Sequence, residues 1–370
     1  MNRRYLYAVA APVIALVAAL VVSTIALLVS GHSPYDAFHA MATKLNSADA
    51  IVGTVNVAAR YYVAGVAVAL GFKMGLFNIG ADGQLRLAAL LAAAAGAAVH
   101  FPAVLHVLFI IVVALLVGGA YAAIPGVLKV TRGVNEVVAT IMLNFIATGL
   151  SAYLLSVYLR DRTVNLVTQT KDLPKSAWLP SLNRVLRAVG YHLPPGTLLQ
   201  GFLVIALLVG VFFYVLIYRT RFGFELLTTG ANPAAALSAG VNAKAMVVKT
   251  IMLSGAIAGL AAMGPLLSEI HNYGDLFPSA LGFTGISVAL LGRNHPAGIA
   301  AAAMVWAGIE TAGRGLSKVH IPQEISQIMQ GTLLISAVIA FEAVRRRGLA
   351  AEVRDAAVRV QAAPEGLGVA

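Results

Sequence analysis

Cysteine is absent from the 370 residues, which excludes disulfide bonds, thiol redox chemistry and thiolate metal sites. Charged residues are also scarce, at 11%, against about 25% in soluble domains. Together with a hydrophobic content of 59% and a mean hydropathy of +0.85, this scarcity excludes a soluble enzyme and a disordered chain. The composition is that of a membrane protein with room for many crossings of about 20 residues each.

Motifs for chemistry are absent as well. The sequence has no G-x-x-x-x-G-K-[ST] phosphate loop and no Ser-Lys, Asp-Asp or H-E-x-x-H constellation of an intramembrane hydrolase. The eight histidines show no metal-ligand spacing along one helix, so no metal site is expected. We therefore expect no enzyme activity, and any ATP that drives this chain must be hydrolysed by another subunit. The net charge of +11 fits the positive-inside rule better than a nucleic-acid partner.

Ten apolar windows predict an all-α polytopic membrane protein with about ten transmembrane helices. The first follows Arg3 and Arg4 and is too long for a cleavable signal. Two windows, 85–99 and 283–291, are too short to cross unaided and adjoin glycine-rich segments, which favours broken or re-entrant helices there. The windows are 5–29, 51–72, 85–99, 103–123, 137–158, 201–218, 247–267, 283–291, 297–313 and 325–341.

Threading these windows with both termini in the cytoplasm places most lysines and arginines inside. Residues 1–345 then form one transmembrane domain, and 346–370 form a cytoplasmic tail. The domain divides into five-helix halves, 1–158 and 198–345, which run in opposite senses and make an inverted repeat. Loop 158–198 lies outside, and loop 219–246 lies inside.

Two polar segments are candidates for a gate or a translocation pathway. The first places Asn78, Asp82 and Gln84 among glycines, where they cap broken helix ends or merely close a turn. The second begins with Asn135 as an N-cap and Glu136 at the positive helix start. Further polar residues follow at helical spacing and share one face of the helix. Because lipid disfavours polar groups, this face either lines a pathway or forms hydrogen bonds that hold the helices together. The polar residues of this face are Thr140, Asn144, Thr148 and Ser151.

Loop 219–246 carries the signature of a short independent helix over 233–239. Asn232 suits its N-cap, Pro233 its first position and Gly240 its end. Such a helix can dock onto a soluble motor, with Ala236 in its middle, or can be an interfacial turn without a partner. In loop 158–198, a helix over 181–190 with Ser181 as its cap is expected to lie on the outer surface. Arg60, in the second window, is expected to reach the interface.

These segments resemble the permease subunits of bacterial ABC importers for nucleosides, ribose-type sugars and branched-chain amino acids, over about residues 50–345. Residues 75–84, together with the block between 128 and 144, are similar to the longer permease of nucleoside-type importers. Asp82 departs from the pattern, where glutamate is expected, but keeps the charge. The resemblance is carried by residues 75–84, by 128–129 with 135–137, 140 and 142–144, by 230–233, which begins with Gly230, by 254–255 with 258–260, and by 282–286 with 289–292.

The resemblance implies a heteromeric importer in the bacterial inner membrane. This chain would pair with a second, shorter permease. It would also bind an ATPase, which holds ATP and Mg²⁺, and an outer substrate-binding protein. It would itself contact lipid but bind no cofactor. The alternative from the inverted halves is an ion-coupled secondary transporter of small polar solutes. Ion coupling usually shows as buried acidic residues at mid-span, and Glu136 and Glu310 both lie toward helix ends.

Overall fold

The computed structural model describes residues 3–164, 166–340 and 343, and the regular elements in this part are helices. This confirms the predicted all-α membrane class, although the number of crossings stays a prediction. Five helical stretches are long and apolar enough to span a membrane. They are α3 (Ala48–Lys73), α5 (Ala103–Arg132), α6 (Glu136–Leu154) with a π-turn (Leu155–Leu159), α8 (Phe202–Arg219), and α11 (Ala243–Ala261) with α12 (Met263–Ser268).

The chain divides into two units. The smaller combines the two ends of the chain, 1–43 and 312–370, and includes α1 (Arg3–Val29), most of α2 (Pro34–Leu45) and a helix over Glu324–Ala340. The larger covers 44–311 and holds all of the candidate site residues. The predicted halves, 1–158 and 198–345, stay a prediction, and the predicted tail 346–370 lies outside the described residues.

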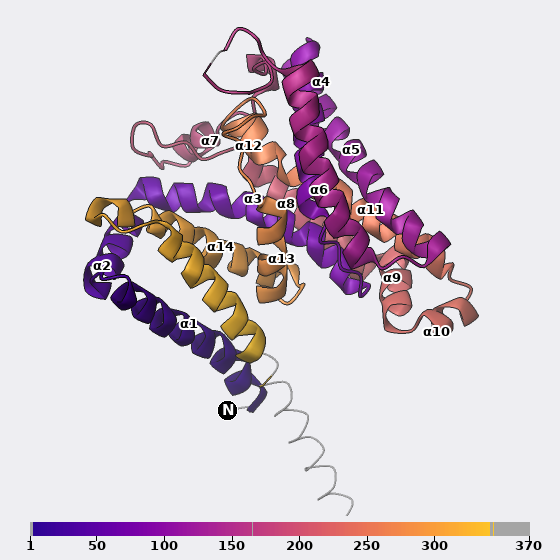
Figure 1. Ribbon diagram of the computed structural model, residues 1–370, viewed down its shortest axis with the longest axis horizontal. Helices are drawn as coiled ribbons and strands as arrows, with labels where there is room; N and C mark the ends of the chain where they lie inside the picture. The colour runs from indigo at the N-terminus through magenta and orange to yellow at the C-terminus, as the bar shows by residue number, and fades with distance from the viewer. Residues whose placement is uncertain (1–2, 165, 341–342, 344–370) are drawn as a thin grey trace, which may run out of the picture. The chain divides into compact units, whose positions relative to one another are not determined.

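In the larger unit, α3, α4 (Ala81–Ala98), α5 and α11 pack together, with α6 against α4 and α13 (Leu281–Leu291) against α3 (Figure 1). Glycines bring α5 and α11 into backbone contact. A Cβ at Gly118 would lie 2.3 Å from the Gly255 carbonyl oxygen, and one at Gly255 would lie 2.2 Å from the Ala122 Cβ. Such close approach lets van der Waals contacts hold helices together in a membrane.

Two helix boundaries correct the sequence prediction. Helix α4 begins at Ala81 rather than at residue 85, so its 18 residues span about 27 Å at 1.5 Å per residue. Its N-cap is Gly80, without a side-chain cap, so none of Asn78, Asp82 and Gln84 caps the start of α4 itself. Helix α5 continues past residue 123 and through Pro125 to Arg132, an internal proline of the kind that membrane helices tolerate.

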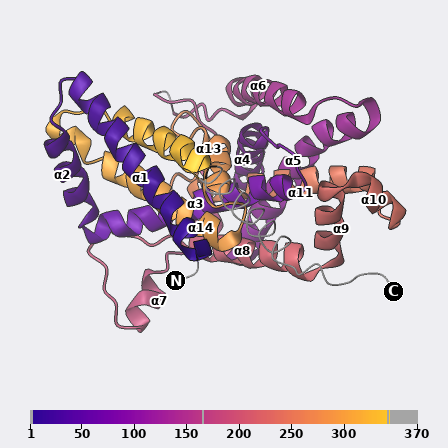
Figure 2. The same ribbon diagram turned by 90° about the horizontal axis from the view of Figure 1, so that it is seen from below.

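The loop after α8 forms two helices that extend beside α11, α9 (Arg221–Ala231) and α10 (Pro233–Ser238) (Figures 1 and 2). The sequence indicated α10 but missed α9. As predicted, Asn232 caps α10 by accepting the N–H groups of Ala234 and Ala235, at 3.0 and 3.1 Å. Gly240 follows with a φ of +79°, a conformation that glycine adopts without strain.

Loop 158–198 pairs with the segment between α12 and α13. The N–H groups of Thr170 and Leu173 donate to the carbonyls of Tyr273 and His271, both at 2.8 Å, and Trp178 stacks on the His271 ring at 3.8 Å. The predicted helix over 181–190 is shorter, α7 (Asn183–Ala188), and Ser181 is not its cap. Asn183 instead binds the returning chain, through the Thr197 carbonyl at 2.7 Å and the Leu199 N–H at 2.9 Å.

The Trp178–His271 stack is expected to respond to pH. Burial lowers the pKa of His271, and a backbone hydrogen bond at Leu266 and the charge of Asp172 oppose the shift only in part. A histidine with a depressed pKa stabilises the fold above its unfolded pKa, about 6.5, and this contribution is lost as pH falls toward the folded pKa. With Trp306→Phe as background, Trp178 fluorescence should hold above about pH 6.5 and change below it. His271→Phe should abolish the change, and a midpoint above the ordinary histidine value would contradict the assignment.

Candidate functional site

Asn78 and Gln84 bind each other beside the start of α4. Asn78 Nδ2 donates to Gln84 Oε1 at 2.9 Å, and Gln84 Nε2 donates back to Asn78 Oδ1 at 3.0 Å. Asn78 Nδ2 also donates to Ser254 Oγ at 2.9 Å, and the Ser254 hydroxyl donates to the Ala67 carbonyl at 2.7 Å. These three side chains are buried, so the network ties the irregular segment before α4 to α3 and α11.

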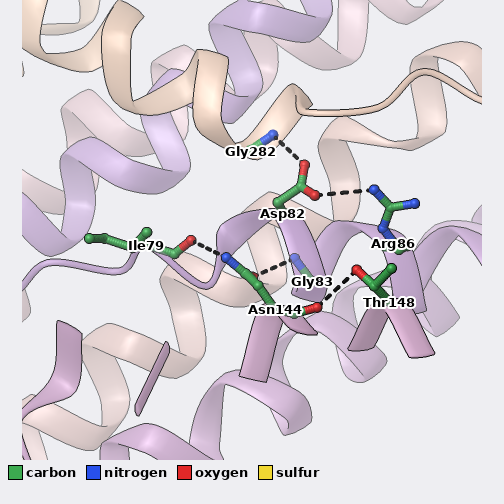
Figure 3. Close-up of polar contacts among 7 residues, drawn as sticks. All are labelled: Ile79, Asp82, Gly83, Arg86, Asn144, Thr148 and Gly282. Atoms are coloured by element: carbon green, nitrogen blue, oxygen red, sulfur yellow. Dashed lines mark hydrogen bonds and ion pairs between the residues drawn. The ribbon is translucent and has the colours of Figure 1, made fainter. Parts of the chain in front are cut away.

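Asn144 of α6 supplies the acceptor that α4 lacks (Figure 3). Its Oδ1 accepts the Gly83 N–H at 2.8 Å, and its Nδ2 donates to the Ile79 carbonyl at 2.8 Å. The first N–H groups of a helix have no partner within the helix, so Asn144 caps α4 from a neighbouring element. Glycine is required at 83, because a Cβ there would lie 2.9 Å from both Asn144 Oδ1 and the Ala147 Cβ.

Asp82 lies where the N-termini of α4 and α13 meet. Its Oδ2 pairs with Arg86 Nη2 at 3.3 Å, and its Oδ1 accepts the Gly282 N–H at 3.3 Å (Figure 3). A carboxylate is favoured there because both helix ends carry partial positive charge. Gly282 permits the approach, since a Cβ would lie 2.2 Å from the Asp82 nitrogen.

Asp82 and Arg86 border an open cleft of about 420 Å³ beside α6. Its walls combine polar groups with the aromatic rings of Phe145 and Phe283, which are 72% and 45% exposed. Such a mixture of apolar wall and few polar groups is typical of small-molecule sites. The lining residues are Ile79, Asp82, Arg86, Ile141, Asn144, Phe145, Thr148, Ser279, Ala280 and Phe283.

The remaining predicted site residues of α6 divide between the cleft region and the start of the helix. Thr140 is buried one turn before Asn144, and a Cβ at Gly80 would lie 3.0 Å from its Cβ. Asn135 caps α6 as predicted, accepting the Val137 N–H at 2.9 Å, and is exposed. Glu136 is buried and pairs with Lys129 Nζ at 2.5 Å. This ion pair connects the start of α6 to the last turn of α5.

Sequence reasoning missed Arg86 and misjudged Arg60. Arg86 lies four residues after Asp82, a spacing that favours an ion pair on a helix and could have indicated it. Arg60 is buried rather than reaching the interface, and its Nη2 pairs with Glu269 Oε2 at 3.2 Å. No local pattern reveals that pair, because its partners come from α3 and the end of α12.

Asn144→Leu is expected to destabilise the contact between α4 and α6. It leaves the Gly83 N–H and Ile79 carbonyl without their partner, at a cost of about 1–3 kcal/mol for each buried group. The unfolding temperature in detergent should fall. Thr148→Val is the matched control, since the Thr148 hydroxyl bonds only the Asn144 carbonyl of its own helix, at 3.0 Å. Equal unfolding temperatures for the two variants would contradict this role of Asn144.

The fold and the polar cluster beside a cleft are those of a membrane transport protein, and comparison with known proteins identifies its family. The family model of the permease component of the branched-chain amino acid transport system matches residues 50–338. The chain therefore belongs to this family of permeases. No solved structure gives a significant match to it.

Curated relatives cover most of the chain. The guanosine ABC transporter permease NupP of Bacillus subtilis is 32% identical over 329 residues, covering 88% of this chain and 91% of that protein. The glucose ABC transporter permease of Haloferax volcanii is 31% identical, covering 88% and 85%. The nucleoside ABC transporter permease NupB of Lactococcus lactis is 29% identical, covering 89% and 90%. These relatives support an ABC permease, with its ATPase on a separate subunit, over an ion-coupled transporter.

Proposed function

We propose that this chain forms the translocation pathway of an ABC importer for nucleosides or related simple sugars. The observation that carries the proposal is the polar seam of Asn78, Asp82, Gln84 and Asn144, which runs from the core of the larger unit to the cleft beside α6. Polar groups inside a membrane protein are costly and usually serve a pathway. Relatives named for guanosine, nucleosides and glucose support the solute class.

The partners follow from the same proposal. Helix α10 docks on the ATPase, which binds ATP and Mg²⁺, while this chain binds no cofactor. The outer loop, with Arg184 and Arg187 exposed on its helix α7, receives an extracytoplasmic binding protein. A second, shorter permease completes a heterodimer in the bacterial inner membrane, with both termini of this chain in the cytoplasm.

Transport by the reconstituted complex tests the proposal. Proteoliposomes that contain this chain, its ATPase and a sister permease, supplied with the binding protein, should accumulate guanosine or glucose only when ATP is present on the ATPase side. A protonophore should leave uptake unchanged. Uptake that survives without ATP and collapses with the protonophore would contradict the proposal. A vanadate-inhibited ATPase provides the control for nucleotide dependence.

A further inference from the structure

Arg86 borders two spaces beside the first turns of α4. One is the cleft described above. The other is a small pocket of about 20 Å³ between α4 and the segment that follows α12, a volume that accommodates one water-sized group. Asp82 lines both spaces too, so both residues of the ion pair border each space. The small pocket is lined by Asp82, Leu85, Arg86, Tyr273, Gly274, Phe277 and Pro278.

The pair keeps hydrogen-bonding capacity in reserve. Each Asp82 oxygen has one partner, whereas a carboxylate can accept about four hydrogen bonds. The Arg86 Nε–H is buried and has no acceptor among the described residues, and Arg86 binds Asp82 through Nη2 alone, not as a bidentate fork. The Tyr273 hydroxyl also interacts with the guanidinium. A carboxylate that can accept and a guanidinium that can donate therefore lie side by side, and their charges cancel.

We propose that Asp82 and Arg86 bind neighbouring hydroxyl groups on the sugar ring of the passing solute and so select hydroxylated solutes. One hydroxyl donates to the Asp82 carboxylate, and the next accepts from the Arg86 guanidinium. The small pocket has room for one such oxygen, while the rings of Phe145 and Phe283 offer an apolar wall to the rest of the molecule. A neutral pair suits an uncharged solute. This inference rests on the proposed function, because nucleosides and simple sugars share a hydroxylated ring.

Solute preference, rather than total uptake, tests the inference. ATP-driven uptake of guanosine and of 2′,3′-dideoxyguanosine is compared in proteoliposomes of the whole complex, and the binding protein's own affinity ratio for the two is measured separately and divided out. The wild-type complex should prefer guanosine. Arg86→Gln should reduce that preference about tenfold or more, the effect of losing one hydrogen bond to a charged group. Asp82→Glu, which keeps the carboxylate, should retain most of it.

Arg60→Lys is the matched control, because Arg60 is also an arginine in an ion pair, is more deeply buried than Arg86, and does not line the cleft. It should leave the preference at the wild-type value. An Arg86→Gln complex that transports with unchanged preference overturns the inference. If that variant does not reach the membrane, Asp82→Asn replaces it, and an unchanged preference there also overturns the inference. A wild-type complex without ATP-dependent uptake of either solute class instead defeats the proposed function.

Discussion

Leu237→Glu should abolish ATP-driven uptake while the chain remains in the membrane. Leu237 lies on α10 with 61% of its surface exposed, whereas its neighbour Ala236 is fully buried. An exposed leucine on a capped helix suits a groove on the ATPase, if loop 219–246 faces the cytoplasm as proposed. Losing an apolar anchor of an interface costs about 2–4 kcal/mol, and a buried charge adds to that loss. Co-purification of the ATPase and its solute-stimulated hydrolysis of ATP measure the effect.

The burial of Ala236 decides which substitution is informative. A bulky residue at Ala236 would disturb the packing of the loop itself, so a loss of uptake there would not separate docking from folding. Ser238→Ala is the matched control, since Ser238 is exposed and its hydroxyl bonds only the Ala234 carbonyl of its own helix, at 3.2 Å. It should behave as wild type. Normal ATPase binding by Leu237→Glu would show that α10 docks through another residue or not at all.

Gly255→Val should strongly destabilise the larger unit. The new Cβ would lie 2.2 Å from the Ala122 Cβ and 2.5 Å from the Gly118 carbonyl oxygen. Backbone atoms cannot move aside by a change of rotamer, so the clash with Gly118 cannot be relieved locally. Overpacking costs about 1–3 kcal/mol and occasionally more, and contact with backbone places this site at the upper end. Thermal unfolding and size-exclusion profiles in detergent measure the loss.

Gly149→Val provides the control, because a Cβ at Gly149 of α6 meets nothing within 4 Å. Both substitutions replace a helical glycine with the same β-branched residue, so the difference in unfolding temperature reports the contact between α5 and α11. If the two variants unfold at the same temperature, the two helices do not approach as closely as the structure shows.

Local signals in the sequence determined the start of α6 and both ends of α10. The caps at Asn135 and Asn232 and the stop at Gly240 were predictable, because a cap depends on residues within one turn. The inward face of α6 was predictable from the spacing of Thr140 and Asn144, because lipid disfavours polar groups. The membrane class followed from composition, since few charges and long apolar runs fit no aqueous fold.

Tertiary structure alone decided which side chains form the site. Asn78 binds Ser254, which is 176 residues away, and Asp82 binds the N–H of Gly282, which is 200 residues away. No local pattern encodes such pairs, since they arise only when α11 and α13 pack beside α3 and α4. The same holds for the start of α4, where Asn144 of another helix supplies the cap, and for Arg60, whose burial depends on Glu269. The sequence supplied polar groups that cannot face lipid, and the packing of the helices determined which of these groups bind each other.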